Sequence, residues 1–143
     1  MNYLWLVLAL LSAISAALVA IFGKIGLQNL DTNTATAIRA IVMAIFLFGV
    51  VVFEGKLHNI QPILANHRAL LFIILSGVAG AVSWLFYFWA LKLGKVQQIV
   101  PIDRMSMVFA VILAVIFLGE KLSLKVIIGT LAMLFGAIII SLA

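Results

Sequence analysis

The residues Ala69–Leu91 read ALLFIILSGVAGAVSWLFYFWAL and contain no charged side chain over 23 positions. An α-helix rises about 1.5 Å per residue, so a stretch of this length can cross the ~30 Å hydrocarbon core of a bilayer. Four further apolar stretches, each about 18–20 residues long, fill most of the remaining chain: Tyr3–Phe22, Thr34–Phe53, Ile99–Leu118 and Val126–Ala143. The pattern predicts an all-α membrane protein, a single transmembrane domain over residues 1–143 with five helices at about 3–22, 34–53, 69–91, 99–118 and 124–143.

The composition excludes several classes of protein. The chain is 67% hydrophobic and 9% charged, with a mean hydropathy of +1.38, whereas soluble domains average about 45–50% apolar and about 25% charged residues. A transmembrane β-barrel would need strands that alternate apolar and polar residues. The chain has no cysteine, and His58 and His67 stand in a connection without a supporting carboxylate or thiol. We therefore expect no enzyme, no metal site, no cofactor and no nucleic-acid partner.

An odd number of spans places the two chain termini on opposite sides of the membrane. A second copy of such a unit, inserted upside down, would complete an inverted-repeat transporter. The odd span count therefore predicts an antiparallel homodimer of this chain, with the lipid bilayer and a small-molecule solute as its other partners.

The basic residues give no clear orientation. If the N-terminus is cytoplasmic, four of them lie on the inner side, and four or five lie on the outer side. Because the positive-inside rule needs an excess on one side, two interpretations stay open. The chain has one orientation and some snorkelling residues are miscounted, or it inserts both ways, which is dual topology. The inner set is Lys56, Arg68, Lys121 and Lys125, and the outer set is Lys24, Arg39, Lys92 and Lys95, with Arg104 just beyond.

Three charges stand about one turn inside the second and fourth spans: Arg39, Asp103 and Arg104. A charge at this depth is costly unless it is paired or solvated, so we predict that Asp103 pairs with Arg39 or Arg104. The remaining positive charge, with Lys24, would then stand at the mouth of a substrate pathway. In the alternative interpretation, Pro101 and Asp103 simply begin the fourth helix, where the helix dipole favours a carboxylate, and the arginines snorkel to headgroups.

Small and aromatic residues share one face of the third span. Gly77, Gly80 and Ala81 are followed by Trp84, Tyr87 and Phe88. This face is either helix packing that ends in an interfacial aromatic belt, or a cavity wall suited to an amphiphilic or cationic solute. Other small-residue faces carry the same two interpretations: Ser12, Ala16 and Ala20 in the first span, and Gly129, Ala132 and Gly136 in the fifth.

The sequence resembles the EamA domains of the drug/metabolite transporter superfamily. The resemblance rests on Phe22–Lys24 followed by Ala35–Arg39, on Gly77–Leu91, and most specifically on FLGEKLS at Phe117–Ser123 followed by Gly129 and Gly136. It covers nearly the whole chain once, as in the stand-alone five-helix group.

The resemblance implies an exporter or exchanger of small metabolites or drug-like solutes that works by alternating access. Helices one to four would line the pathway, with Lys24 and Arg39 carried over as site residues and Glu120 as a turn determinant. The related four-helix multidrug transporters carry a membrane-embedded Glu in helix one, where this chain offers only Ser12 and Ser15.

The predicted function is therefore a multi-pass transporter of the plasma (inner) membrane of a prokaryote. The expected pathway residues are Ser12, Ser15, Lys24, Arg39, Gly80, Trp84, Tyr87, Asp103 and Arg104. Two alternatives stay open: an accessory subunit that acts only beside a sister membrane protein, and a scaffold that organises lipid.

Overall fold

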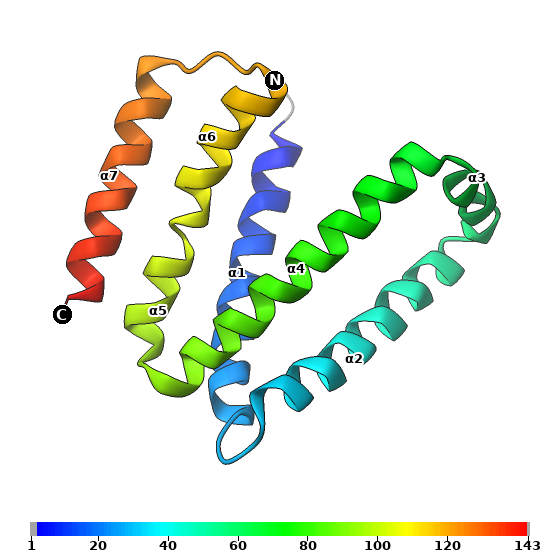
Figure 1. Cartoon of the computed structure of the whole chain (residues 1–143), viewed down its shortest axis with the longest axis horizontal. Coiled ribbons are helices and arrows are strands. Elements are labelled where there is room, and N and C mark those ends of the chain that lie inside the picture. The colour runs from blue at the N-terminus through cyan, green and yellow to red at the C-terminus, as the bar shows by residue number, and fades with distance from the viewer. Residues whose placement is uncertain (1–2, 143) are drawn as a thin grey trace. The chain divides into compact units, whose positions relative to one another are not determined.

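The computed structural model describes residues 3–142, in which every regular element is helical. Five candidate spans in this part of the chain are long and apolar enough to cross a membrane, as predicted (Figure 1). The elements in chain order are α1 (Leu4–Gly26), α2 (Thr32–Phe53), the 3₁₀ turn η1 (Leu57–Asn59), α3 (Ile60–Ala65), α4 (His67–Leu93), α5 (Val96–Asp103), α6 (Ser106–Leu118) and α7 (Leu124–Ser141).

Most helices extend beyond their predicted ends. The first was expected to stop at residue 22 but continues to Gly26, the second begins at Thr32 rather than 34, and the third covers 67–93 rather than 69–91. The fifth begins at Leu124 as predicted, and the last predicted position, residue 143, lies outside the described residues. Hydropathy marks where apolar residues stop, whereas a helix continues into polar residues until a cap ends it.

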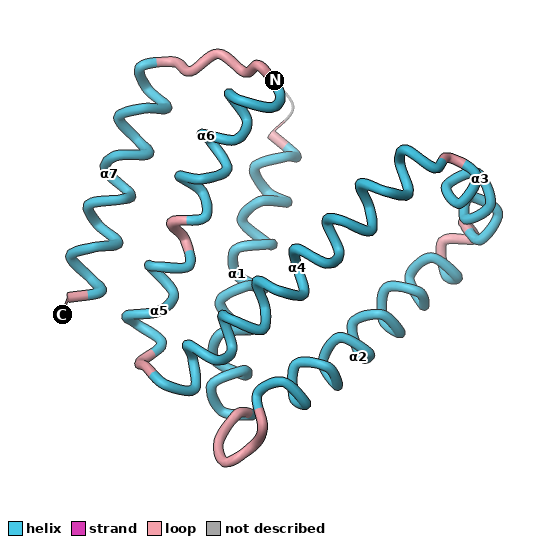
Figure 2. Tube along the Cα trace, in the orientation of Figure 1, coloured by secondary structure: helices cyan, strands magenta, loops and turns pink. Residues whose placement is uncertain are grey.

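The fourth span is not one continuous helix, which corrects the predicted 99–118. It begins at Val96 and is interrupted at Arg104 and Met105, between α5 and α6 (Figure 2). The amide groups of Met105, Met107 and Val108 bond three residues back there, the tighter 3₁₀ pattern, instead of four. Pro101 lies inside α5 and Asp103 is its last residue, so the interpretation that these two residues begin the helix is wrong.

The chain divides into two compact units, which we describe separately. One contains Met1–Ile25 with Leu93–Ala143, and the other contains Gly26–Lys92. In the first unit α7 packs against α5 and α6, and Ala137 of α7 is buried. In the second unit, α2 and α4 form a helical hairpin connected by η1 and α3 (Figure 1).

Side chains cap two of the long helices at their N-termini. The Asp31 carboxylate accepts hydrogen bonds from the Thr34 backbone N–H at 2.8 Å and the Thr34 hydroxyl at 2.7 Å, so it caps α2. These two bonds hold the pKa of Asp31 below its ordinary value of 3.8. Their contribution to stability is therefore present above that ordinary value and is lost as the pH falls through the lowered pKa. The sequence predicts Ser123 as the N-cap of the last helix, and the Ser123 Oγ accepts from the Val126 N–H at 3.3 Å, which confirms it.

Two glycines end helices in the left-handed conformation. Gly55, with φ of +68°, follows α2, where the Gly55 N–H donates to the Val52 carbonyl and the Lys56 N–H to the Val51 carbonyl, each at 3.0 Å. This pair of bonds is a Schellman motif. Gly119, with φ of +67°, also ends α6 in the left-handed conformation, but with a different bond pattern, since its N–H donates to the Ala114 carbonyl. The Glu120 N–H donates to the Ala114 carbonyl at 3.3 Å in this turn.

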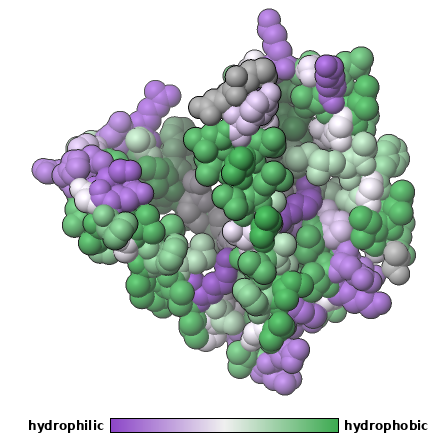
Figure 3. All heavy atoms as spheres, turned by 180° about the vertical axis from the view of Figure 1, so that it is seen from behind, coloured by the Kyte–Doolittle hydropathy of each residue, from purple (hydrophilic) through white to green (hydrophobic). Residues whose placement is uncertain are grey.

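The long helices expose their large apolar side chains. Phe46 is 70% exposed and Phe53 is 94% exposed, and most other large hydrophobic residues of the described chain are more than one-third exposed. The hydrophobic colouring that covers much of the face in Figure 3 shows the same property. A soluble monomer rarely carries so much contiguous apolar surface, whereas a lipid environment requires it.

The glycine-containing faces are open within this chain. A Cβ built at Gly77, Gly80, Gly129 or Gly136 would meet no heavy atom of another segment within 4 Å. Within its own unit each of these glycines therefore lies clear of other helices, and the interpretation of the faces as packing against a partner outside the unit stays a prediction. Their small side chains leave space for something outside the described structure, such as lipid, solute or a second copy.

The two kinds of glycine yield a stability prediction. Gly55→Ala places a Cβ on a left-handed residue, which costs about 1–2 kcal/mol. Gly49 lies in the middle of α2 with open space around it, so Gly49→Ala should leave stability equal or raise it by up to about 1 kcal/mol. Reversible unfolding in mixed detergent micelles measures both, and equal stabilities for the two variants would contradict the Schellman assignment.

Candidate functional site

A groove runs between α2 and α4 within the unit Gly26–Lys92. Its volume is about 470 Å³, inside the range of ~300–1,000 Å³ that small-molecule sites occupy. One face of each helix lines it. The lining residues are Asn33, Thr36, Ala37, Arg39, Ala40, Met43, Ala44 and Leu47 of α2, and Gly77, Gly80, Ala81, Trp84 and Leu85 of α4.

Arg39 is the charged residue of this lining, and its guanidinium lies against aromatic rings. The Cζ atom is 3.6 Å from the centroid of the Trp84 ring and 5.1 Å from that of Phe88. A cation over a ring face is attracted by the ring quadrupole, by about 0.5–1 kcal/mol in exposed sites and about 2 kcal/mol when desolvated. Arg39 is half-buried, so we expect about 1 kcal/mol here.

The aromatic residues form a cluster that supports Arg39. Trp84 and Phe88 are stacked with centroids 5.4 Å apart, and Tyr87 meets Trp84 edge-on at 5.6 Å. Phe88 is only 3% exposed, so the ring that stacks with Trp84 is itself held in place by packing. The cavity-wall and the aromatic-belt interpretations of this part of α4 therefore each fit different residues. Trp84 lies on the groove wall, whereas Trp89 is 56% exposed, as expected of an interfacial belt.

The α2 wall was missed by the sequence analysis except for Arg39. Asn33, Thr36, Ala40, Met43 and Leu47 follow each other at intervals of three or four residues, the spacing of one helix face. That spacing, counted from Arg39, was a signal that would have found them. The Thr36 hydroxyl is already bonded to the Thr32 carbonyl at 2.7 Å, so it offers a groove occupant an acceptor rather than a donor.

Arg39 is deeper than predicted, since α2 begins at Thr32 and Arg39 follows about two turns later. Among residues 3–142 no hydrogen bond or ion pair of its guanidinium is recorded, and the salt bridge of the described chain joins Lys56 to Glu54 at 2.7 Å. The contact with the Trp84 and Phe88 rings is therefore the interaction that stabilises the Arg39 charge in the span.

The predicted site residue Lys24 binds a backbone carbonyl, and so does Lys92, which was counted only among the outer basic residues. The Lys24 Nζ donates to the Gly94 carbonyl at 2.7 Å, just after the end of α4. The Lys92 Nζ donates to the Leu30 carbonyl at 2.8 Å, in the turn before α2. Ammonium groups commonly satisfy carbonyls that helix ends and turns leave open. This geometry gives both lysines a structural role.

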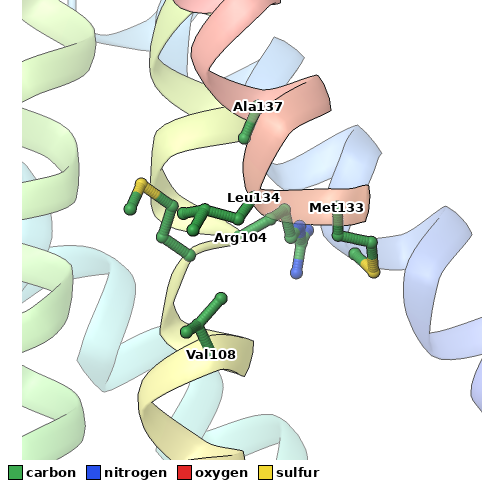
Figure 4. Close-up of a pocket in the computed structure, with 6 residues that line it drawn as sticks. Arg104, Val108, Met133, Leu134 and Ala137 are labelled. Atoms are coloured by element: carbon green, nitrogen blue, oxygen red, sulfur yellow. The ribbon is translucent and has the colours of Figure 1, made fainter. Parts of the chain in front are cut away.

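Asp103 and Arg104 lie at the break between α5 and α6, in the other unit. Arg104 lines a small pocket with Val108 and with Met133 of α7 (Figure 4). The volume of this pocket is about 10 Å³, enough for about one water molecule and too small for a solute. The salt bridge of residues 3–142 joins Lys56 to Glu54, and the pairing of Asp103 with Arg104 stays a prediction. The pairing with Arg39 joins the two units and stays a prediction.

The remaining predicted residues lie in both units. Two serines belong to α1, and three residues of α4 belong to the unit that contains the groove. The Ser15 hydroxyl donates to the Leu11 carbonyl of its own helix at 2.9 Å, so Ser15 needs no water-filled cavity. Ser12 is exposed on α1. Gly80 and Trp84 line the groove with Arg39, and the Tyr87 ring meets the Trp84 ring edge-on. The structure thus brings Arg39, Gly80 and Trp84 together in one site.

The contact between Arg39 and Trp84 predicts an energetic coupling. A double-mutant cycle with Arg39→Gln and Trp84→Leu should give a coupling of about 1 kcal/mol in unfolding free energy, because either single change already removes the contact. The matched cycle of Arg39→Gln with Trp89→Leu should give a coupling near zero, since Trp89 is on a different face. A coupling near zero in both cycles would show that the ring does not stabilise the cation.

Five apolar helices and a charged, aromatic-walled groove inside the spans define a multi-pass membrane protein with the features of a solute carrier. A family comparison agrees: residues 3–142 match the model of the EamA-like transporter family. The chain belongs to this family and is a membrane transporter, as the resemblance implied.

Two relatives are similar over different lengths. A Sinorhizobium protein named "Uncharacterized transporter in cobO 3'region" is 39% identical over 141 residues, which cover 99% of each chain. A protein of Methanocaldococcus jannaschii is 30% identical over 81 residues, which cover 57% of this chain and 59% of its own. No solved structure matches.

Proposed function

We propose that the protein moves a small metabolite or drug-like solute across the membrane by alternating access, and that the groove between α2 and α4 is part of the solute pathway. The observation that carries the proposal is the position of Arg39, a half-buried charge about two turns inside an apolar span, on the wall of a groove. Charged residues inside spans are costly and mostly line water-filled cavities or substrate pathways.

The assembly we propose is an antiparallel homodimer. One chain supplies five spans, so a second, inverted copy would give the two-fold pseudo-symmetry that many secondary transporters have. The open glycine faces are compatible with such a partner. Arg39 and Arg104 lie within candidate spans, so the loops and helix ends hold the other basic residues. These number four on one side and three on the other, which is still too even for a strong orientation.

The accessory-subunit hypothesis makes a different use of the same groove. A sister membrane protein would fill it with its own helix, and water would not reach its walls. The groove would then be a packing surface, and a thiol placed on it would be shielded. Solvent access to the groove therefore separates the two hypotheses.

The first prediction concerns two alanines of α4. Ala81 lines the groove, and Ala79, two residues earlier on the same helix, does not. Since the chain has no cysteine, Ala81→Cys and Ala79→Cys each give a single thiol. Position 81 should react with a membrane-impermeant maleimide in proteoliposomes, from both sides of the bilayer if access alternates. Position 79 should react much more slowly because a thiol in lipid does not ionise.

The matched pair also gives the contradicting result. Equal, slow labelling at positions 79 and 81 would mean that no water reaches the groove, and the accessory-subunit hypothesis would replace the transporter. Fast labelling at both positions would mean that the local structure is open everywhere, and the groove would lose its special status.

The second prediction concerns orientation in the plasma membrane of a prokaryotic cell. Reporter fusions after the last residue should be active on both sides of the membrane, and one or two added lysines in the Leu27–Asp31 turn should shift the population to one side. Lysines added in η1 should shift it the opposite way. A reporter signal from one compartment alone, in cells without another copy, would exclude the antiparallel homodimer.

A further inference from the structure

Resting on the proposed transport function, the geometry points to a solute that carries an oxyanion, such as a carboxylate, on an apolar body. The oxyanion would bind the guanidinium edge of Arg39, and the apolar body would lie along the α2 and α4 walls. Three features of the groove support this class of solute over a cationic one.

The first feature is the occupied ring face. A cationic solute would bind over the face of an aromatic side chain, and the Trp84 face in this groove is already covered by Arg39 at 3.6 Å. The cation of the site is thus the protein's own. A second cation placed there would meet the Arg39 charge in a medium of low dielectric constant, where repulsion is strong.

The second feature is the set of donors that the aromatic contact leaves available. The five N–H groups of a guanidinium lie in its plane and form a fork that matches a carboxylate with two parallel hydrogen bonds. Contact over a ring uses the face of the guanidinium rather than this edge. No hydrogen bond of the Arg39 guanidinium is recorded within residues 3–142.

The third feature is the charge and size of the lining. None of the described lining residues is acidic, and the remaining walls are apolar apart from Asn33 and Thr36. Asp31, the nearest acidic residue in sequence, is exposed and bonded to Thr34. A volume of about 470 Å³ accommodates a ring-sized apolar group beside the anion.

Three probes with the same cyclohexyl body test the charge preference: cyclohexanecarboxylate, cyclohexylmethanol and cyclohexylmethylamine. Binding to the full chain in phosphatidylcholine nanodiscs at pH 7 is read from Trp84 fluorescence, with Trp5→Phe and Trp89→Phe removing the other two tryptophans. The carboxylate should bind about 10- to 100-fold tighter than the alcohol, the ratio expected for hydrogen bonds to a charged group. The amine should bind most weakly.

Substitutions then assign the preference to Arg39. In Arg39→Gln the ratio of carboxylate to alcohol affinity should fall to near one. In Arg39→Lys it should be intermediate, because an ammonium keeps the charge but not the fork. Arg68→Gln is the matched control, since Arg68 lies in the first turn of α4 outside the lining, and it should leave the ratio unchanged. If Arg39→Gln does not fold, judged by gel filtration, the Arg39→Lys ratio decides.

An anionic lipid headgroup presents the same chemistry as the solute, so the measurement is repeated with phosphatidylglycerol in the nanodiscs. A soluble solute predicts that carboxylate binding persists. Loss of that binding would make a lipid headgroup the occupant and would overturn the proposal.

Three further outcomes would overturn the oxyanion proposal. The alcohol or the amine binds as tightly as the carboxylate or tighter, the carboxylate preference survives Arg39→Gln, or no probe shows saturable binding. These failures are distinguishable from failure of the transport function. Water access at Ala81→Cys without a carboxylate preference leaves the transporter and rejects the solute class, whereas a shielded position 81 rejects both.

Discussion

The contact between the Arg39 guanidinium and the Trp84 ring is the interaction on which the candidate site depends. An arginine about two turns inside a transmembrane helix is costly, and insertion scales put the cost at about 2.5–3.5 kcal/mol at the helix centre. The cation–π contacts with Trp84 and Phe88 offset part of this cost, and Phe88, almost fully buried, stacks beside Trp84. Without the aromatic wall, the guanidinium would have to snorkel toward the headgroups, and the groove would lose its charge.

The same contact explains why the hairpin of α2 and α4 leaves a groove. Two non-covalent contacts hold the start of α2 near the end of α4. The Arg39 guanidinium lies over the Trp84 ring, and the Lys92 ammonium donates to the Leu30 carbonyl just before α2. Farther along, the facing residues are small, with Ala40 and Ala44 on one helix and Gly77 and Gly80 on the other. Small side chains near an aromatic anchor leave a volume that no other described side chain fills. The positive charge of the groove, its aromatic wall and its open volume therefore all depend on the contact between Arg39 and Trp84.

The sequence predicted the spans well because insertion in lipid depends mainly on residue type over about 20 positions. It also predicted the Ser123 cap, and the shared face of Gly80 and Trp84. The contact of Arg39 with Trp84 was not predicted, since it joins residues 45 positions apart and depends on how two helices cross. The break at Arg104 and Met105 was not predicted, because the charges of Asp103 and Arg104 were interpreted as a pair or as a helix start and not as an interruption of the helix. The carbonyl bonds of Lys24 and Lys92 depend on loop geometry, which residue type alone does not fix.

The most direct test of the account is whether the Arg39 side chain lies over an indole ring in a bilayer. The chain has three arginines, so NMR of arginine-labelled protein in nanodiscs gives few side-chain signals, which Arg68→Lys and Arg104→Lys assign. The account predicts that the Arg39 δ-proton and ε-proton signals are shifted upfield by the Trp84 ring current, and that Trp84→Leu removes the shift. Arg39 signals that coincide with those of Arg68 and Arg104, and that do not respond to Trp84→Leu, would contradict it.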